Sequence, residues 1–90
     1  MEVKVVKLVN GEELIGEYEE NMNGDVILKD PFGIVYANKG IHLIKYMPYT
    51  QDSDKLVIGK QHVIFARLAV EGMANDYIQA RSGIRLGGLN

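Results

Sequence analysis

Apolar and polar residues alternate with a period of two along most of the chain, and this pattern predicts short β-strands. The first, Val3–Val9, is rich in β-branched residues and ends at Asn10-Gly11, the dipeptide most typical of a tight β-hairpin turn. The phase of the apolar positions slips between Val5 and Val6, which predicts a bulge or a strong bend at that point.

A second strand is expected directly after the hairpin, because residues 13 to 20 alternate apolar positions with glutamates. Gly16 lies inside this run, where it predicts a sharp bend or a crowded approach of another segment. A turn over residues 21 to 24 leads to a third strand, Asp25–Lys29, which we expect to end at Asp30-Pro31.

The rest of the sheet is expected in four segments separated by turns and by a polar loop over residues 50 to 54: Gly33–Ala37, Ile41–Met47, Leu56–Ile58 and His62–Val70. Apolar residues recur at helical spacing from about Gly72 to Arg81, and the glycine-rich segment Ser82–Asn90 is expected to fray. The chain therefore predicts a single domain over residues 1–90, of mainly β class. It should be a small, strongly bent antiparallel barrel of five strands or slightly more over about 3–70, with a short C-terminal helix and tail over about 72–90.

The size of the chain limits its stability as a single copy. Ninety residues and 10.1 kDa correspond to one small domain, which buries about 60–65% of its unfolded surface, so association with further copies is a common remedy. No apolar run approaches the roughly 20 residues that span a bilayer, and Met1 leads directly into a charged strand-like segment. We therefore expect no membrane span, no secretory signal and a cytoplasmic location.

Few side chains suited to covalent or metal chemistry are present. There is no cysteine, the histidines are His42 and His62, and the aliphatic hydroxyls are Thr50, Ser53 and Ser82. Their spacing does not suggest a catalytic triad or a metal site, and no glycine-rich phosphate loop is present. We therefore expect a binding or assembly module rather than an enzyme, with no cofactor and no metal.

The net charge of −2 is divided unevenly along the chain. Residues 1–30 hold three lysines against eight acidic residues, whereas residues 31–90 hold seven lysines or arginines against four acidic residues. Because a general polyanion binder is basic overall, any contact with nucleic acid is expected to be local, at a focused patch or pore.

Two segments carry a resemblance to the Sm-like family, which includes the archaeal and eukaryotic LSm proteins and the bacterial Sm-like RNA chaperone. The first runs from Val5 to Gly16, with Asn10-Gly11, an apolar residue three positions further at Leu14, and the second glycine. The second, Leu56–Ile64, is similar to the strand–turn–strand that ends an Sm core, and its Lys60-Gln61-His62 turn resembles that of the bacterial chaperone. The resemblance covers roughly residues 3–30 and 55–70, and it also extends to small acidic Sm-like chains of bacterial viruses.

The resemblance implies a barrel whose two turns bind single-stranded RNA near a ring pore. The residues in the matching turns are Asn21, Asn23 and Asp25, and Lys60, Gln61 and His62. The chain departs from the family pattern in placing its helix last, in shortening the first turn, and in having Gly59-Lys60 where most LSm proteins have Arg-Gly. For both turns an alternative stays open, since Asn and Asp are ordinary turn formers and Lys60 to His62 could form a solvated hairpin turn.

A second cluster allows two interpretations. Tyr36, Tyr46, Tyr49 and Phe32 surround the segment that separates the two matching regions. They could stack on bases, or they could pack one end of the barrel or a seam between subunits, where tyrosine is favoured.

The last predicted strand is apolar on both faces, with Arg67 as its one strongly polar interruption. Such a strand needs a covering layer and a partner for its free edge. In the Sm-like family a neighbouring subunit supplies that partner head to tail, so we expect a closed homo-oligomeric ring of about five to seven copies. Its seam should involve Leu56, Ile58, Val63, Phe65 and Leu68. The two functional hypotheses are a ring that binds short single-stranded RNA, and a structural or regulatory ring that binds protein partners without RNA.

Overall fold

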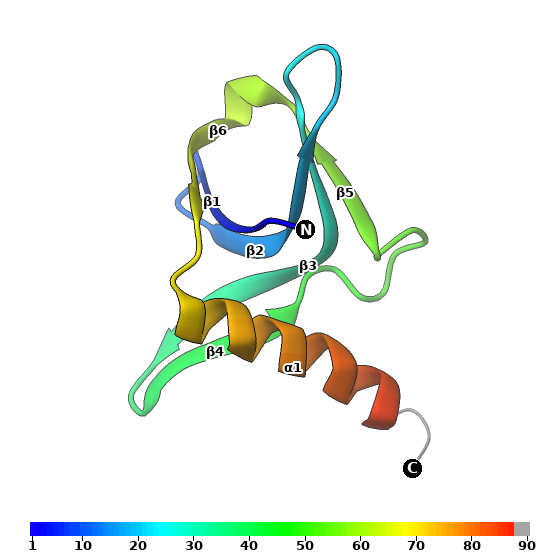
Figure 1. The fold of residues 1–90 in the computed structure, drawn as a ribbon. Coiled ribbons are helices and arrows are strands. Elements are labelled where there is room, and N and C mark those ends of the chain that lie inside the picture. The colour runs from blue at the N-terminus through cyan, green and yellow to red at the C-terminus, as the bar shows by residue number, and fades with distance from the viewer. Residues whose placement is uncertain (88–90) are drawn as a thin grey trace.

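Six strands form one strongly bent antiparallel sheet, and a single helix follows them at the C-terminal end (Figure 1). The computed structural model describes residues 1–87. The elements are β1 (Val3–Leu8), β2 (Glu13–Glu20), β3 (Val26–Ala37), β4 (Gly40–Lys45), β5 (Lys55–Ile58), a short 3₁₀ turn (Lys60–His62), β6 (Val63–Leu68) and α1 (Glu71–Gly87). The predicted fold class, a mainly β, strongly bent antiparallel sheet with a C-terminal helix, is confirmed.

The strands are ordered β4-β3-β2-β1-β6, and β5 pairs separately with β3. The long strand β3 makes this possible because it has two partners on one edge: its first part pairs with β5 and its second part with β4. The prediction that the third strand ends at Asp30-Pro31 is wrong, since β3 continues through both residues. Asp30 has a left-handed φ of 49°, so the chain bends between the two partners without leaving the sheet.

Strand β1 is buried on both of its faces. Val6 and Leu8 point into one apolar core with Leu14 of β2, whereas Val3 lies in a second core with Ile15. This double burial accounts for the slip in apolar phase, so the predicted bulge between Val5 and Val6 is wrong. The pairing of β1 with β2 is regular there, and a register shift occurs instead against β6, between Lys7 and Leu8.

The glycine inside β2 marks the bend, as predicted. The register between β2 and β3 shifts between Ile15 and Glu17, on either side of Gly16. A Cβ atom at Gly16 would lie 3.0 Å from the backbone oxygen of Lys29 and 3.3 Å from Cβ of Leu28. A side chain here would push β3 away by a few tenths of an ångström, so glycine permits the close approach.

Helix α1 covers the second core, on the face of the sheet opposite the first (Figure 1). Its Tyr77 ring is fully buried and packs edge to face on Phe32, with ring centroids 5.7 Å apart. The helix is longer than the predicted Gly72–Arg81, since it runs from Glu71 to Gly87, and the expected fraying of Ser82–Asn90 stays a prediction. Residues 88–90 of the predicted tail lie outside the described residues.

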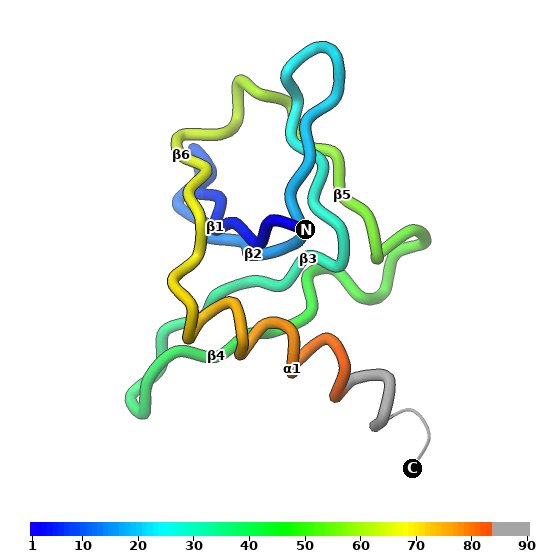
Figure 2. Tube along the Cα trace, in the orientation of Figure 1, coloured from blue at the N-terminus to red at the C-terminus, as the bar shows by residue number. Residues whose placement is uncertain are grey.

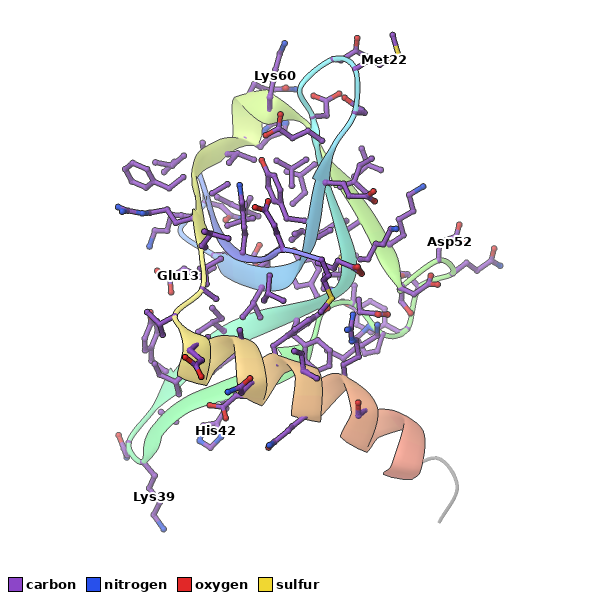
Figure 3. The ribbon with its side chains drawn as sticks, viewed as in Figure 1. Glu13, Met22, Lys39, His42, Asp52 and Lys60 are labelled. Atoms are coloured by element: carbon purple, nitrogen blue, oxygen red, sulfur yellow. The ribbon has the colours of Figure 1, made fainter. Side chains whose placement is uncertain are left out.

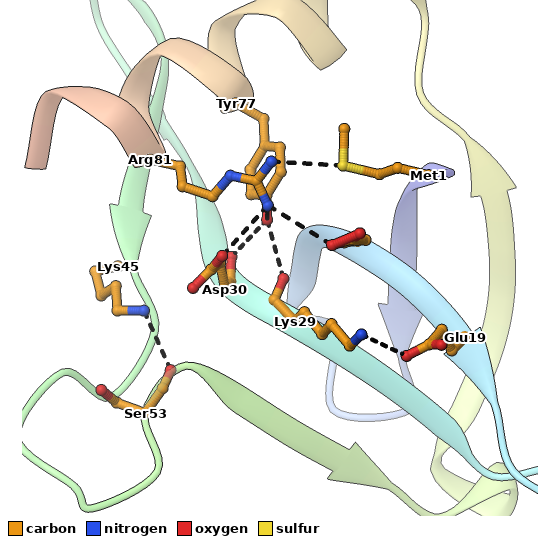
Figure 4. A network of polar contacts seen from close by, with 9 residues as sticks. Met1, Glu19, Lys29, Asp30, Lys45, Ser53, Tyr77 and Arg81 are labelled. Atoms are coloured by element: carbon orange, nitrogen blue, oxygen red, sulfur yellow. Dashed lines mark hydrogen bonds and ion pairs between the residues drawn. The ribbon is translucent and has the colours of Figure 1, made fainter. Parts of the chain in front are cut away.

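The contacts of Tyr77 and Arg81 fix the helix to the bend in β3 (Figure 4). The Tyr77 hydroxyl lies 2.9 Å from the backbone oxygens of both Lys29 and Asp30. The Arg81 guanidinium contacts the Asp30 carboxylate at 3.3 Å. Burial is the main cause that raises the pKa of Tyr77 above its usual value, so the ring is held as a neutral donor.

Candidate nucleic-acid interface

Two turns that are far apart in sequence meet at one end of the molecule (Figures 2 and 3). The turn after β2 and the 3₁₀ turn after β5 are joined by Lys60, whose ammonium donates a 2.8 Å hydrogen bond to the backbone oxygen of Asn23. The backbone N–H of Lys60 donates to the Asp25 carboxylate at 2.9 Å. The structure therefore brings together the two turns that the sequence singled out.

The first turn is held by its own side chains. The side-chain oxygen of Asn21 accepts hydrogen bonds from the backbone N–H groups of Asn23, at 2.9 Å, and Asp25, at 3.0 Å. Gly24 adopts a left-handed φ of 85°, and a Cβ atom at this position would lie 3.5 Å from Cδ of Lys60. Asn21 thus has the role of a turn former.

The charges of this cluster balance. The backbone N–H of Lys60 lowers the pKa of the Asp25 carboxyl below its usual value, which keeps Asp25 ionised beside the Lys60 ammonium. The side chain of Asn23 and the ammonium of Lys60 are exposed to solvent. We call Asn21, Asn23, Asp25 and Lys60 the two-turn cluster.

Gln61 and His62 lie beside the two-turn cluster rather than in it. The Gln61 amide folds back over Gly59, where a Cβ atom would meet it at 2.8 Å. The backbone of His62 accepts a hydrogen bond from Val9 and donates one to Gly59, both at 2.9 Å. His62 also lines a groove along β5.

The residues expected at a seam fall into two groups. Ile58 is only 7% exposed and belongs to the core of this chain, and Leu56 and Val63 are half-buried against the same core. Phe65 and Leu68, in contrast, are 61% and 65% exposed on β6. Within residues 1–87 the outer edge of β6 has no partner strand, and the same holds for the outer edges of β4 and β5.

The predicted aromatic cluster is divided between two places. Phe32 lies beneath α1, whereas Tyr36, Tyr46 and Tyr49 line an open groove of about 770 Å³. The Tyr46 hydroxyl donates a hydrogen bond to Glu12 at 3.1 Å. We call this feature the tyrosine groove.

A second carboxylate closes the rim of the tyrosine groove. The Tyr36 hydroxyl donates to Glu13, which lowers the pKa of the Glu13 carboxyl and raises the pKa of the Tyr36 phenol. Sequence reasoning missed Glu12 and Glu13 as partners of the tyrosines. Their contacts join residues 34 and 23 positions apart, and no local pattern reports such distances.

Neither a cluster of metal-ligating side chains nor a membrane-spanning helix is present in the part of the chain that the structure describes. It contains no group of three or more His, Asp or Glu side chains placed to hold a metal ion. It also contains no helix long and apolar enough to cross a membrane.

The fold and its polar clusters define a class: a small bent-sheet β protein with free strand edges and an exposed site at two adjoining turns. In comparisons with known proteins, no protein-family model and no curated protein matches the chain. The resemblance to the Sm-like family therefore stays a prediction that rests on this chain's own residues.

Proposed function

We propose that the chain is the subunit of an Sm-like homo-oligomeric ring that binds short single-stranded RNA at its two-turn cluster. The observation that carries the ring is that two of the three strand edges without a partner among residues 1–87 lie on opposite sides of one small sheet, β6 on one side and β5 on the other. Unpaired edges template association, and a head-to-tail contact between two different edges closes into a ring when its rotation permits.

The side chains beside these edges match one another. Leu68 and Ile64 project from β6 with much of their surface exposed. Beside β5 lies an open groove of about 390 Å³, whose apolar walls include Leu8, Met47 and Leu56. When β6 of one copy pairs with β5 of the next, its apolar side chains cover this groove, in a ring of about five to seven copies.

The RNA site is supported by the Lys60 ammonium, which contacts the backbone oxygen of Asn23 beside the exposed Asn23 carboxamide, while Asn21 shapes the turn that presents them. Carboxamides can read base edges, and an ammonium can contact a phosphate. Because Asp25 balances the charge of Lys60, one cluster binds weakly. A ring repeats the cluster in every copy, so successive contacts along one strand add in avidity.

Light scattering coupled to size exclusion tests the ring. At micromolar concentration the wild-type chain should have about five to seven times the subunit mass, and Phe65→Glu or Leu68→Glu should lower that mass. Ile41→Glu is the matched control, because Ile41 is an exposed apolar residue on β4, away from the proposed seam. A wild-type monomer would refute the ring.

Fluorescence titration with labelled oligo-U and oligo-A at two salt concentrations tests the RNA site. Lys60→Gln should weaken binding, whereas Lys39→Gln should leave it unchanged, since Lys39 lies at the opposite end of the molecule (Figure 3). A ring that binds neither oligonucleotide would refute the RNA site. The alternative, a ring that binds protein partners without RNA, would then be the hypothesis to test.

A further inference from the structure

The tyrosine groove lies on a different part of the molecule from the two-turn cluster and takes no part in the proposed RNA site. Its floor is apolar and formed by Leu14, Val35 and Ile44, and its walls carry Tyr46 and Tyr49. Tyr49 is 83% exposed, although an apolar ring of this size is ordinarily buried at least in part. Exposed tyrosine beside exposed aliphatic residues is typical of a protein-binding surface.

The charge at the rim of the tyrosine groove determines which kind of ligand the groove can bind. Among residues 1–83, whose side chains are described, Glu12 takes part in no ion pair, and its carboxylate accepts hydrogen bonds only from the neutral donors Asn10 and Tyr46. Lys45 also borders the groove, but its ammonium donates to the backbone oxygen of Ser53 and lies 5.9 Å from the Phe32 ring. Glu12 is therefore a carboxylate without an ion-pair partner among the described side chains.

This charge disfavours nucleic acid in the groove. A phosphate backbone next to Glu12 would be repelled, although the tyrosine rings alone would suit base stacking; the charge of Glu13 is paired with Lys7 at 3.3 Å and adds little. A lysine or arginine side chain is the complementary occupant, because its charge pairs with a carboxylate and its cation is attracted to the face of a tyrosine ring. Its aliphatic stem also covers apolar surface.

The sheet supplies a backbone partner as well. Strand β4 contributes Ile44 and Lys45 to the groove, and its outer edge has no partner strand among residues 1–87. An extended peptide can add to such an edge through main-chain hydrogen bonds, with alternate side chains directed to the same face. The proposed ring seam uses β5 and β6, so it leaves the β4 edge open. The tyrosine groove adjoins the groove beside β5 that the seam covers, because Glu12, Tyr46 and Met47 border both.

We propose that the tyrosine groove binds an extended, cationic and apolar segment of a partner protein, in which lysine or arginine alternates with aliphatic residues. The cationic side chains pair with Glu12 and the tyrosine rings, and the segment adds to the free edge of β4. This is a second binding surface, independent of whether the two-turn cluster binds RNA.

The test is a fluorescence anisotropy titration with a labelled hexapeptide of alternating arginine and valine. The full-length protein should bind it, and Glu12→Gln and Tyr49→Ala should each weaken binding about threefold, with about tenfold for the double variant. The matched control is Glu71→Gln, which changes the net charge equally at the start of α1. The control should bind like wild type, and thermal melts should show all four variants folded.

Three outcomes would overturn the inference. The first is a double variant that binds the peptide as tightly as wild type does. The second is equal binding of a hexapeptide of alternating glutamate and valine, because the rim charge would then have no role. The third is no binding by wild type. Tyr49 lines the tyrosine groove and not the groove beside β5, so a lower mass of the assembly in Tyr49→Ala would assign the tyrosine groove to a second copy of the chain and overturn the inference as well.

Discussion

Replacing Tyr77 with phenylalanine tests how the helix is fixed to the sheet. The ring of Tyr77 is completely buried, and its hydroxyl lies 2.9 Å from the backbone oxygens of Lys29 and Asp30. Phenylalanine keeps the edge-to-face packing on Phe32 and removes only the hydroxyl. Two partly buried backbone oxygens then lose this donor at the point where Asp30 has a left-handed φ of 49°.

The expected loss follows from the cost of leaving buried polar groups unpaired. That cost is about 1–3 kcal/mol, and we expect Tyr77→Phe to lie near 2 kcal/mol because both oxygens share one donor. For a domain of this size, such a change lowers Tm by about 8–16 °C. Tyr77→Ala removes the ring as well and should cost about 3–5 kcal/mol, a large part of the total stability of a small domain.

Urea unfolding followed by circular dichroism, at one fixed protein concentration, measures this loss. The concentration is held constant because assembly contributes to apparent stability. Tyr49→Phe is the control, since the Tyr49 side chain is 83% exposed and its hydroxyl has no hydrogen bond within the described part of the chain. If Tyr77→Phe and Tyr49→Phe unfold at the same urea concentration, the hydroxyl does not fix the helix and the reasoning fails.

Two further predictions concern glycine and tyrosine. Gly16→Ala should lower the free energy of unfolding by about 1–3 kcal/mol, because its Cβ would lie 3.0 Å from a backbone oxygen. Gly83→Ala, on the open side of α1, should instead raise the free energy of unfolding by about 0.5–1 kcal/mol. Urea unfolding measures both variants, and equal effects would contradict the packing argument. Burial, together with the hydrogen bond to Glu20, raises the pKa of Tyr18 to about 12. The stability that this raised pKa contributes to the folded state should therefore be complete below pH 10 and lost as the pH rises through about 12. Absorbance titration of phenolate should lose its latest step in Tyr18→Phe, and an unchanged titration would contradict this assignment.

Features with a local cause could be predicted from the sequence. The Asn10-Gly11 turn and the bend at Gly16 each depend on the conformational freedom of one glycine, and both are where the pattern placed them. The end of β3 could not be predicted in this way. Asp30-Pro31 has the local signature of a stop, but partners from β4 and β5 hold the strand on both sides of it.

The contacts at the candidate sites also differ in how far the sequence could predict them. The meeting of Asn23 and Asp25 with Lys60 was predictable because a resemblance supplied the long-range pairing that periodicity cannot. No such guide existed for Glu12 and Tyr46, or for the contact of Tyr77 with Asp30, which joins residues 47 positions apart. These pairs depend on how far the sheet bends, and that bend is a property of the whole sheet.

The charge balance sets a limit on how the proposed ring could bind RNA. At −2 per chain, a ring of six copies carries about −12, which repels a polyanion at long range. Salt screens this repulsion beyond about 8–10 Å at physiological ionic strength, but it screens a direct contact between Lys60 and a phosphate much less. The two effects oppose each other as salt rises. The logarithm of the RNA affinity should therefore fall less steeply with the logarithm of the salt concentration than the number of Lys60–phosphate contacts alone would require. A measured slope that corresponds to one released counterion per contact would place the binding at a different, more basic surface.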